Sequence, residues 1–405
     1  MRFTFGYFLF FICLTSSYAQ SDHQIVIGTI DSLQSEILGE QRRVWVYVPN
    51  GSDQDIYSKQ KYPVVYLLDG PGHFLSVVGM IHQLSTTNGN TLCPEMIVVG
   101  IENTNRSRDL TPTKSTDGPL ADNSGGGENF IAFMEKELMP YIEANYPTQP
   151  YRMLIGHSLG GLTAIHVLLH HPDLFNACIS IDPSMWWDDR HLLSEAATLF
   201  REKNFSGKSL YLGIANTMPE DMTLKKLKKD TSDATNHQRA IFDLSQLLDK
   251  NQKNGLRYRY KYYEDDDHGS VPLITEYDAL RFIFDFFSFD INTEALNDST
   301  NMVGDAIEDH FKIVSEKMGY TVYPPENLIN GLGYMAMQNE NMKQAEYFFK
   351  MNVRHYPESF NVYDSLGDYY VAMEDKEHAI QSFKEALKIR ENVFSRNKLE
   401  GLLKK

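Results

Sequence analysis

The chain has 405 residues, of which 42% are hydrophobic and 12% aromatic, and its formal net charge at pH 7 is −16. A chain of this length is too long to fold around one small hydrophobic core, so we expect at least two domains. The composition excludes a disordered chain. The acidic charge argues against nucleic acid and anionic membranes as natural partners, because both require basic surfaces.

The first 19 residues have the pattern of an export signal. Arg2 is the lone positive charge, the run Phe3–Leu14 is almost wholly apolar, and Ala19 offers a small residue at the cleavage position. The run is too short to favour a membrane span, although an uncleaved anchor is the alternative. We therefore expect a periplasmic or secreted protein without membrane contact beyond this segment.

Segments of strand length recur between helical patterns. The first two alternate apolar and polar residues, as half-exposed antiparallel strands do, and the later ones are more continuously apolar. The expected strands are Gln24–Ile30, Arg42–Val48, Tyr62–Gly70, Met96–Ile101, Met153–Ile155, Ala177–Ile181, Ser209–Ile214 and Arg257–Tyr263; the expected helices are Phe130–Ala144, Leu162–His171, Arg239–Leu248 and Asp278–Phe287. Over residues 20–290 this alternation predicts an α/β fold, with a mostly parallel sheet covered by helices on both faces.

The most informative segment is Gly156-His157-Ser158-Leu159-Gly160, which an apolar strand precedes and a helical pattern follows. Strand, sharp turn and helix are the context of a nucleophile elbow. In such a turn the serine backbone is strained, and the flanking glycines avoid side-chain collisions. The alternative is a glycine-rich turn with an ordinary N-cap serine. We predict that Ser158 is a nucleophile.

A serine nucleophile needs a base, and His268 is the best candidate. It follows the last expected strand and lies on a turn marked by Gly269, where α/β-hydrolases place their histidine. The rival histidines lie in the elbow or on expected helices: His157, His166, His170, His171 and His237.

The acid that orients the base is expected after the strand that precedes the histidine's strand. Glu220 lies in that loop and is our prediction. Asp221 beside it and Asp182, at the end of the previous strand, are alternatives, as is a serine–histidine dyad without an acid.

Two backbone amides are expected to form the oxyanion hole. One is the N–H of Leu159, directly after the serine, and the other comes from the loop after Asp69. Pro71 has no N–H, so the second donor must be Gly72 or His73, and we predict Gly72.

Substrate contacts are expected from two arginines and a tryptophan. Arg106 and Arg108 lie just past a strand's carboxyl end, where ligands collect in open α/β sheets, and suit an acidic or catecholate group. An ion pair of these arginines with Asp109 or a neighbour is the alternative. Trp186 is predicted to wall an acyl or aromatic pocket, although core packing by it or Trp187 is an alternative.

Residues 321–405 contain an internal repeat. Leu332-Gly333, Ala345 and Phe349 recur 34 residues later as Leu366-Gly367, Ala379 and Phe383. This period is typical of tetratricopeptide helix pairs. Two repeats are too few for independent stability, so we expect them to dock on the α/β domain after a linker at 291–320. The repeats are also the expected site for a protein partner.

Residues 62–270 resemble the putative esterase family of α/β-hydrolases, which contains siderophore-trilactone esterases, feruloyl esterases and mycolyltransferases. The resemblance lies in three segments: Tyr66–Gly70, Gly156–Gly161 and His268–Ser270. The trilactone-esterase-like branch is closest, through Asn103–Pro112 and Pro183–Trp187.

The resemblance implies hydrolysis of a carboxylic ester through an acyl-serine at Ser158, without metal or organic cofactor. In the family the second oxyanion donor directly follows the Asp-Gly pair, and Pro71 departs from that pattern. The histidines and cysteines also lack metal-ligand spacing.

We therefore expect an exported serine esterase that acts on a small-molecule ester, such as a siderophore-type lactone or an esterified sugar. Acyl transfer to a sugar or peptide acceptor is one alternative. The other is an inactive scaffold that recruits a partner through the helical repeats.

Overall fold

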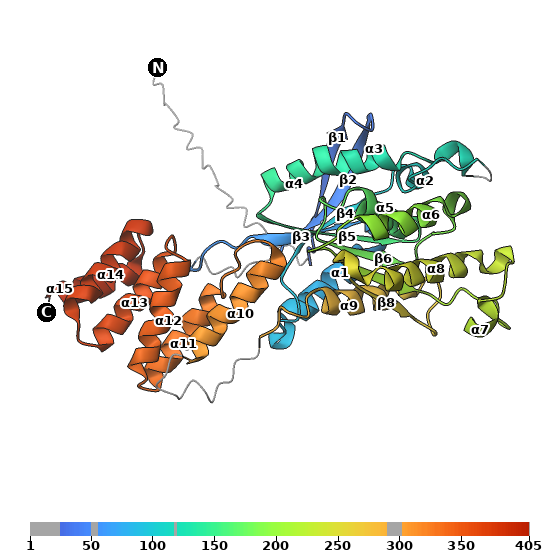
Figure 1. The fold of residues 1–405 in the computed structure, drawn as a ribbon. Helices are drawn as coiled ribbons and strands as arrows, with labels where there is room; N and C mark the ends of the chain where they lie inside the picture. The colour runs from blue at the N-terminus through green and yellow to red at the C-terminus, as the bar shows by residue number, and fades with distance from the viewer. Residues whose placement is uncertain (1–24, 50–55, 117–119, 290–301, 405) are drawn as a thin grey trace, which may run out of the picture.

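The computed structural model describes residues 25–49, 56–116, 120–289 and 302–404. The predicted export signal at 1–19 lies outside the described residues. An α/β domain around one sheet is followed by an all-helical region that extends to one side of it (Figure 1). Among the described helices, none combines the length and the apolar character needed to cross a bilayer.

The sheet confirms the predicted fold class. Its order is β1-β2-β4-β3-β5-β6-β7-β8, with β1, β2 and β4 paired antiparallel and the pairs from β4 through β8 parallel. The strands are β1 Thr29–Ser35, β2 Glu40–Tyr47, β3 Tyr62–Leu67, β4 Ile97–Ile101, β5 Thr148–His157, β6 Ala177–Ile181, β7 Ser209–Ile214 and β8 Arg257–Tyr262. The order reverses around β3, so the carboxyl ends of β3 and β5 flank the crevice where such sheets bind ligands.

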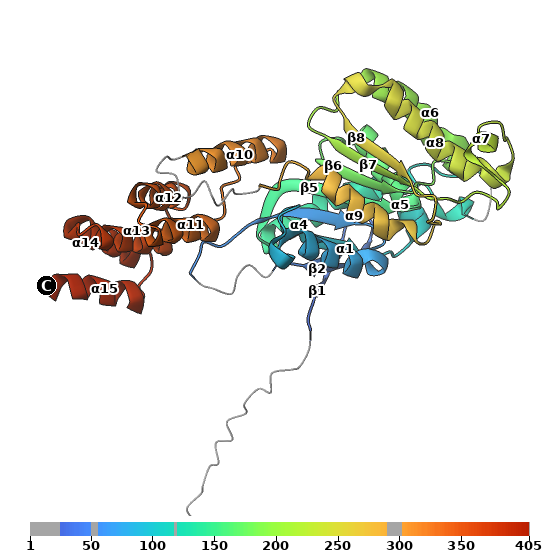
Figure 2. The same cartoon turned by 90° about the horizontal axis from the view of Figure 1, so that it is seen from below.

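Helices cover both faces of the sheet, which explains why β3, β4 and β6 are buried along their whole length (Figures 1 and 2). One core contains side chains of α1 and α9, and the other contains those of α3, α4, α5, α6 and α8. The helices are α1 Gly70–Ser85, α2 Arg106–Asp109, α3 Gly127–Phe133, α4 Met139–Asn145, α5 Leu159–His170, α6 Trp187–Glu202, α7 Leu224–Leu227, α8 Asn236–Lys250 and α9 Val271–Ile283.

Several predicted boundaries differ from the observed ones. The first strand begins at Thr29 rather than Gln24, and the last helix begins at Val271 rather than Asp278. The expected helix Phe130–Ala144 is divided by a π-helical turn at Met134–Leu138. Pro140 follows that turn and cannot donate to the carbonyl four residues earlier, which accounts for the irregularity. Helices α1 and α6 are not among the predicted helices.

The helical region contains the predicted 34-residue period. Helix α11 begins at Glu326 and α13 at Phe360, 34 residues later (360 minus 326). In each pair a glycine faces a buried phenylalanine: a Cβ on Gly333 would lie 2.7 Å from the Phe349 ring, and one on Gly367 would lie 2.5 Å from the Phe383 ring. The tetratricopeptide assignment itself stays a prediction. The helices are α10 Met302–Met318, α11 Glu326–Gln338, α12 Met342–His355, α13 Phe360–Ala372, α14 Lys376–Ile389 and α15 Val393–Lys404.

The predicted linker at 291–320 needs correction, because its described part is the helix α10. Val314 and Met318 of α10 belong to the same apolar cluster as Tyr151 and Phe284 of the α/β domain. The backbone N–H of Ser58 also donates to the Glu326 carboxylate of α11 over 2.8 Å. These contacts agree with the expected docking of the helices on the α/β domain.

Candidate active site

Ser158 occupies a strained turn between β5 and α5. Its φ of 60° and ψ of −114° lie outside the regions that a non-glycine residue normally adopts. A Cβ on Gly156 would lie 2.2 Å from the Gly160 carbonyl oxygen, and one on Gly161 would lie 2.9 Å from the Ile181 carbonyl oxygen. The glycines are therefore required sterically, and the segment has the geometry of a nucleophile elbow.

The elbow is attached to the end of the neighbouring strand β6. The Ser158 N–H donates to the Ile181 carbonyl over 2.9 Å, and the Ser184 N–H donates to the Ser158 carbonyl over 3.0 Å. The two serine hydroxyl oxygens are 3.3 Å apart. Leu159 is the first residue of α5, so its N–H is one of the amides that a helix leaves without an internal acceptor. This is the position predicted for an oxyanion donor.

Asp182, at the carboxyl end of β6, is the carboxylate that meets His268. Its Oδ2 lies 2.6 Å from His268 Nδ1, and its Oδ1 accepts the Ala215 N–H over 3.0 Å. Burial alone would raise the pKa of Asp182, but hydrogen bonds from His237 and His268 outweigh it and hold that pKa well below its ordinary value. Asp182 is therefore ionised near neutral pH and can only accept hydrogen bonds.

The structure does not bring Glu220 to this site. Glu220 and Asp221 are exposed on the turn after β7, whereas Asp182 is buried and hydrogen-bonded to the histidine. The predicted choice of acid is corrected by this geometry: the alternative Asp182 holds the position assigned to Glu220.

His268 is held by its own loop and by the loop after β7. The Asp267 carboxylate accepts the N–H groups of Gly269 and Ser270, which closes a tight turn around the histidine. The Asn216 N–H donates to the Asp266 carbonyl over 2.7 Å, linking the two loops. Because ionised Asp182 accepts from Nδ1, that nitrogen carries the hydrogen and Nε2 is left as the acceptor.

His237 belongs to the same group of side chains, although the sequence pattern did not place it there. From the first turn of α8 its Nε2 lies 2.8 Å from Asp182 Oδ2, the same oxygen that His268 contacts, and the two rings meet edge to face. The sequence contained a histidine at a helix start, but only the fold brings it to Asp182. These three residues also have the spacing of metal ligands, with ligand atoms within 4.8 Å of one another.

A second group of polar side chains lies next to His157, the residue before Ser158. The His157 ring is 4.4 Å from the His268 ring and 5.8 Å from the His73 ring, measured between centroids. Burial, and then the charge on His268, lower the pKa of His157 to about 4, so it is neutral near pH 7. His73 Nδ1 lies 3.3 Å from buried Glu276, and that hydrogen bond raises the pKa of His73.

The predicted oxyanion donor Gly72 is engaged elsewhere. Its N–H donates to the Asp69 carbonyl over 2.9 Å and closes the first turn of α1. The prediction for Gly72 is therefore not supported by the observed hydrogen bonding, and it fails because α1 begins at Gly70, directly after the strand.

Arg106 lies beside the elbow but is paired. Its guanidinium binds both carboxylate oxygens of Asp69, at 2.6 and 2.9 Å, and one nitrogen lies 3.3 Å from the His157 carbonyl oxygen. A bidentate pair of this kind fixes the loop after β3. Substrate binding by Arg106 stays a prediction.

Arg108 belongs to a separate ion-pair network. It contacts both Glu40, at 2.6 Å, and Asp109, at 2.7 Å, and buried Arg42 lies 2.6 Å from the same Asp109. The hydrogen bonds with Glu40 and Asp109 raise the pKa of Arg108. The geometry favours the structural alternative for Arg108.

The two tryptophans differ in burial. Trp187 is buried and its indole N–H donates to the Thr113 carbonyl over 3.1 Å, so it is a core residue. Trp186 is 37% exposed and follows the loop that carries Ser184. Of the pair, only Trp186 has an exposed side chain, and its contact with a substrate stays a prediction.

The model of the family described as "Putative esterase" matches residues 35–270, more than half of the chain. Among curated proteins, the "Siderophore enterobactin esterase" of Emericella nidulans is 27% identical over 51% of this chain and 77% of its own length. The "Ferri-bacillibactin esterase BesA" of Bacillus subtilis is 28% identical over 55% of this chain and 78% of its own.

Solved structures show the same fold. An IroE-like serine hydrolase from Shewanella oneidensis has a TM-score of 0.68 and 29% identity, and the match covers 81% of this chain and 99% of that one. An uncharacterised protein from Capnocytophaga ochracea, at 16% identity, covers 93% of this chain and 99% of its own with a TM-score of 0.58, a likeness of fold alone.

Proposed function

We propose, given that this chain belongs to the Putative esterase family and is a carboxylic ester hydrolase, that it works through an acyl-serine at Ser158. The observation that carries this proposal is the hydrogen bond from His268 to Asp182, with the His268 ring 4.4 Å from the ring of His157, the residue before the strained serine. Serine, histidine and aspartate then act as nucleophile, base and orienting acid.

In the first half-reaction His268 Nε2 takes the hydroxyl proton of Ser158 while Oγ attacks the ester carbonyl carbon. The negative charge that develops on the carbonyl oxygen is stabilised by the Leu159 N–H. When the carbon–oxygen ester bond breaks, His268 returns the proton to the leaving alcohol oxygen. Ser158 then carries the acyl group.

In the second half-reaction water replaces the alcohol. His268 takes a proton from the water as its oxygen attacks the acyl carbon, and then gives that proton to Ser158 Oγ as the acid leaves. Throughout both steps ionised Asp182 keeps the imidazole in the required tautomer and stabilises its positive charge.

The proposed substrate is a small siderophore-type ester. Relatives that align with about half of this chain are named for hydrolysis of enterobactin and ferri-bacillibactin. Trp186 supplies an exposed aromatic surface on the loop of Ser184, which suits an aromatic acyl group.

We also propose that the protein is exported. The support is the charge, apolar run and small residues of the first 19 positions. The N-terminal sequence of the protein recovered from an expressing bacterium tests this: a mature chain beginning near Gln20 is expected, and one beginning at Met1 in the cytoplasmic fraction would contradict it.

The mechanism is tested by intact-protein mass after treatment with a fluorophosphonate, on the parent and on Ser158→Ala and His268→Ala. A single adduct on the parent, absent from Ser158→Ala and strongly slowed in His268→Ala, is expected. An adduct that persists on folded Ser158→Ala would refute the proposed nucleophile.

The substrate class is tested separately by chromatography of products from enterobactin and from a p-nitrophenyl ester. Ester hydrolysis of both, lost together in Ser158→Ala, is expected. Hydrolysis of the simple ester alone would leave the serine mechanism intact and reject the siderophore class. Repeating the reaction with a sugar acceptor distinguishes hydrolysis from acyl transfer.

A further inference from the structure

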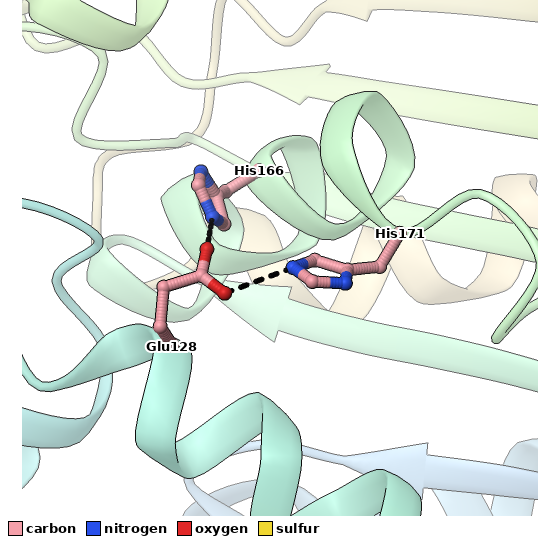
Figure 3. A group of neighbouring side chains, drawn as sticks. All are labelled: Glu128, His166 and His171. Carbon is pink, nitrogen blue, oxygen red and sulfur yellow. Dashed lines mark hydrogen bonds and ion pairs between the residues drawn. The ribbon is translucent and has the colours of Figure 1, made fainter.

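Two helices on one face of the α/β domain bring a carboxylate and two imidazoles together, away from Ser158. Glu128 is in the first turn of α3, His166 is on α5, and His171 directly follows α5. His166 Nε2 lies 2.5 Å from one Glu128 carboxylate oxygen, and His171 Nε2 lies 3.0 Å from the other. Figure 3 shows both rings directed at the single carboxylate.

This group has the composition of a transition-metal site. Its ligand atoms all lie within 4.8 Å of one another. Two imidazoles and one carboxylate are a donor set that Zn²⁺ uses with a fourth position open to water, at about 2.0–2.2 Å from each ligand. Imidazole also favours zinc over magnesium or calcium, which prefer oxygen donors.

The C-terminal end of α5 favours a cation beside it. His171 stands at the C-terminal end of α5, where the backbone carbonyls carry partial negative charge. Glu128 stands at the N-terminal end of α3, where a carboxylate is stabilised. A divalent ion bound to Glu128 would thus sit beside the negative end of α5 and be balanced by the carboxylate itself.

The His166 ring is buried and held in place by its neighbours. The His166 side chain is only 9% exposed. His170 stacks on the His166 ring at 4.5 Å between centroids and lies 3.3 Å from Glu195 of α6, which restricts the rotation of the His166 ring.

We propose that Glu128, His166 and His171 form a binding site for Zn²⁺ that clamps α3 to the C-terminal end of α5. Tetrahedral ligand atoms at about 2.1 Å from the ion stand about 3.4 Å apart, so the 2.5 Å contact between Glu128 and His166 must lengthen. The Glu128 side chain is 55% exposed and has room to rotate. The fourth ligand is water.

The sequence pattern does not predict this site, and the expectation of a metal-free chain followed from that. Four residues separate His166 and His171, a spacing that zinc motifs do use, so the expectation that the histidines lack ligand spacing was wrong for this pair. Two histidines alone do not define a site, and the third ligand, Glu128, is 38 residues away from His166. The ligands meet only because α3 packs beside the end of α5.

The test is a zinc titration of the full chain, freed of metal with a chelator, in competition with a zinc indicator dye. One zinc per chain is expected for the parent. His171→Ala and Glu128→Gln are expected to weaken binding by at least about 100-fold, since losing even an outer-shell partner costs about 10–100-fold. Cobalt titration should give visible absorption bands of a four-coordinate site in the parent and lose them in His171→Ala.

Two matched variants show whether the zinc is bound at these three residues or at another histidine of the chain. His191→Ala removes a half-exposed histidine near Glu195, and His237→Ala removes a member of the other metal-like group. Both should bind zinc within threefold of the parent. Failure of the folded parent to bind zinc overturns the proposal, as does tight binding that His237→Ala abolishes and His171→Ala does not. The readout is binding alone, so it is independent of esterase activity.

Discussion

His268 Nδ1 and His237 Nε2 converge on one carboxylate oxygen, Asp182 Oδ2, at 2.6 and 2.8 Å. The other oxygen of Asp182 accepts a backbone N–H, so the carboxylate is held from three directions. A group fixed in this way can orient an imidazole without moving during the reaction.

Asp182→Asn is expected to lower kcat/KM by about 10²–10⁴-fold, because the amide no longer favours the Nδ1–H tautomer of His268. Glu220→Gln is the matched control and should stay within twofold of the parent. The measurement is steady-state hydrolysis of a p-nitrophenyl ester, with circular dichroism to establish folding. Equal losses in both variants, or a loss in Glu220→Gln alone, would reverse the assignment of the acid.

His237 is expected to position Asp182 rather than to touch the substrate. His237→Leu should reduce kcat by about tenfold, corresponding to ~1.4 kcal/mol, with KM unchanged. His237→Gln, which keeps an N–H donor, should recover most of the loss. If KM rises instead of kcat falling, His237 contacts the substrate and the positioning role is wrong.

The stability contribution of Asp182 depends on pH with a defined sign. The folded-state pKa of Asp182 lies below its ordinary value of 3.8. The contribution is therefore present above that ordinary value and is lost as the pH falls through the folded value. The difference in free energy of unfolding between the parent and Asp182→Asn should be constant near neutral pH and shrink below about pH 4. Urea denaturation at several pH values measures it, and a difference that grows in acid would contradict the sign.

The sharp turn at Ser158 could be predicted from the sequence because each part of its context is local: a strand, two glycines and a helix follow one another along the chain. The acid was not. Glu220 and Asp182 both follow buried strands, and only the observed sheet shows the His268 loop reaching across β7 to the end of β6. Local pattern cannot supply that relationship.

The same limit applies to Arg108 and to α10. The main partner of Arg108, Glu40, is 68 residues away in the sequence. Sequence spacing therefore could not show whether Arg108 forms an ion pair or binds a ligand. Helix α10 follows a polar segment and buries Val314 and Met318 against the α/β domain. From sequence alone, the polar residues before α10 predict a connector. The helix becomes evident only when the surface of the α/β domain that it packs against is known.

The elbow glycines offer a direct steric test. Gly156→Ala places a Cβ 2.2 Å from a backbone oxygen that cannot move without disturbing α5, so destabilisation of at least about 2 kcal/mol is expected, with loss of activity. Gly72→Ala is the control, because nothing lies within 4 Å of its Cβ. Thermal unfolding and esterase assays measure both effects, and equal stability of the two variants would be inconsistent with the close approach.

A similar pair tests the helical repeats. Gly333→Ala forces a Cβ to 2.7 Å from the buried Phe349 ring, which should cost about 1–3 kcal/mol. Gly331→Ala, in the same helix but with open space around its Cβ, should be stabilising by about 0.5–1 kcal/mol through helix propensity. Chemical denaturation of the full chain separates them. A neutral Gly333→Ala would mean that the helix pair is not packed as described.

Strand β8 is an edge strand, and among the described strands it pairs with β7 alone. The strand leads directly into the loop of His268, whereas Ser158 follows β5, which has neighbours on both sides. The free energy needed for local opening is smaller for an edge strand than for a central strand. On warming, we therefore expect the His268–Asp182 contact to be lost before strand β5 and the turn of Ser158 unfold. Loss of esterase activity should then precede the loss of bulk secondary structure.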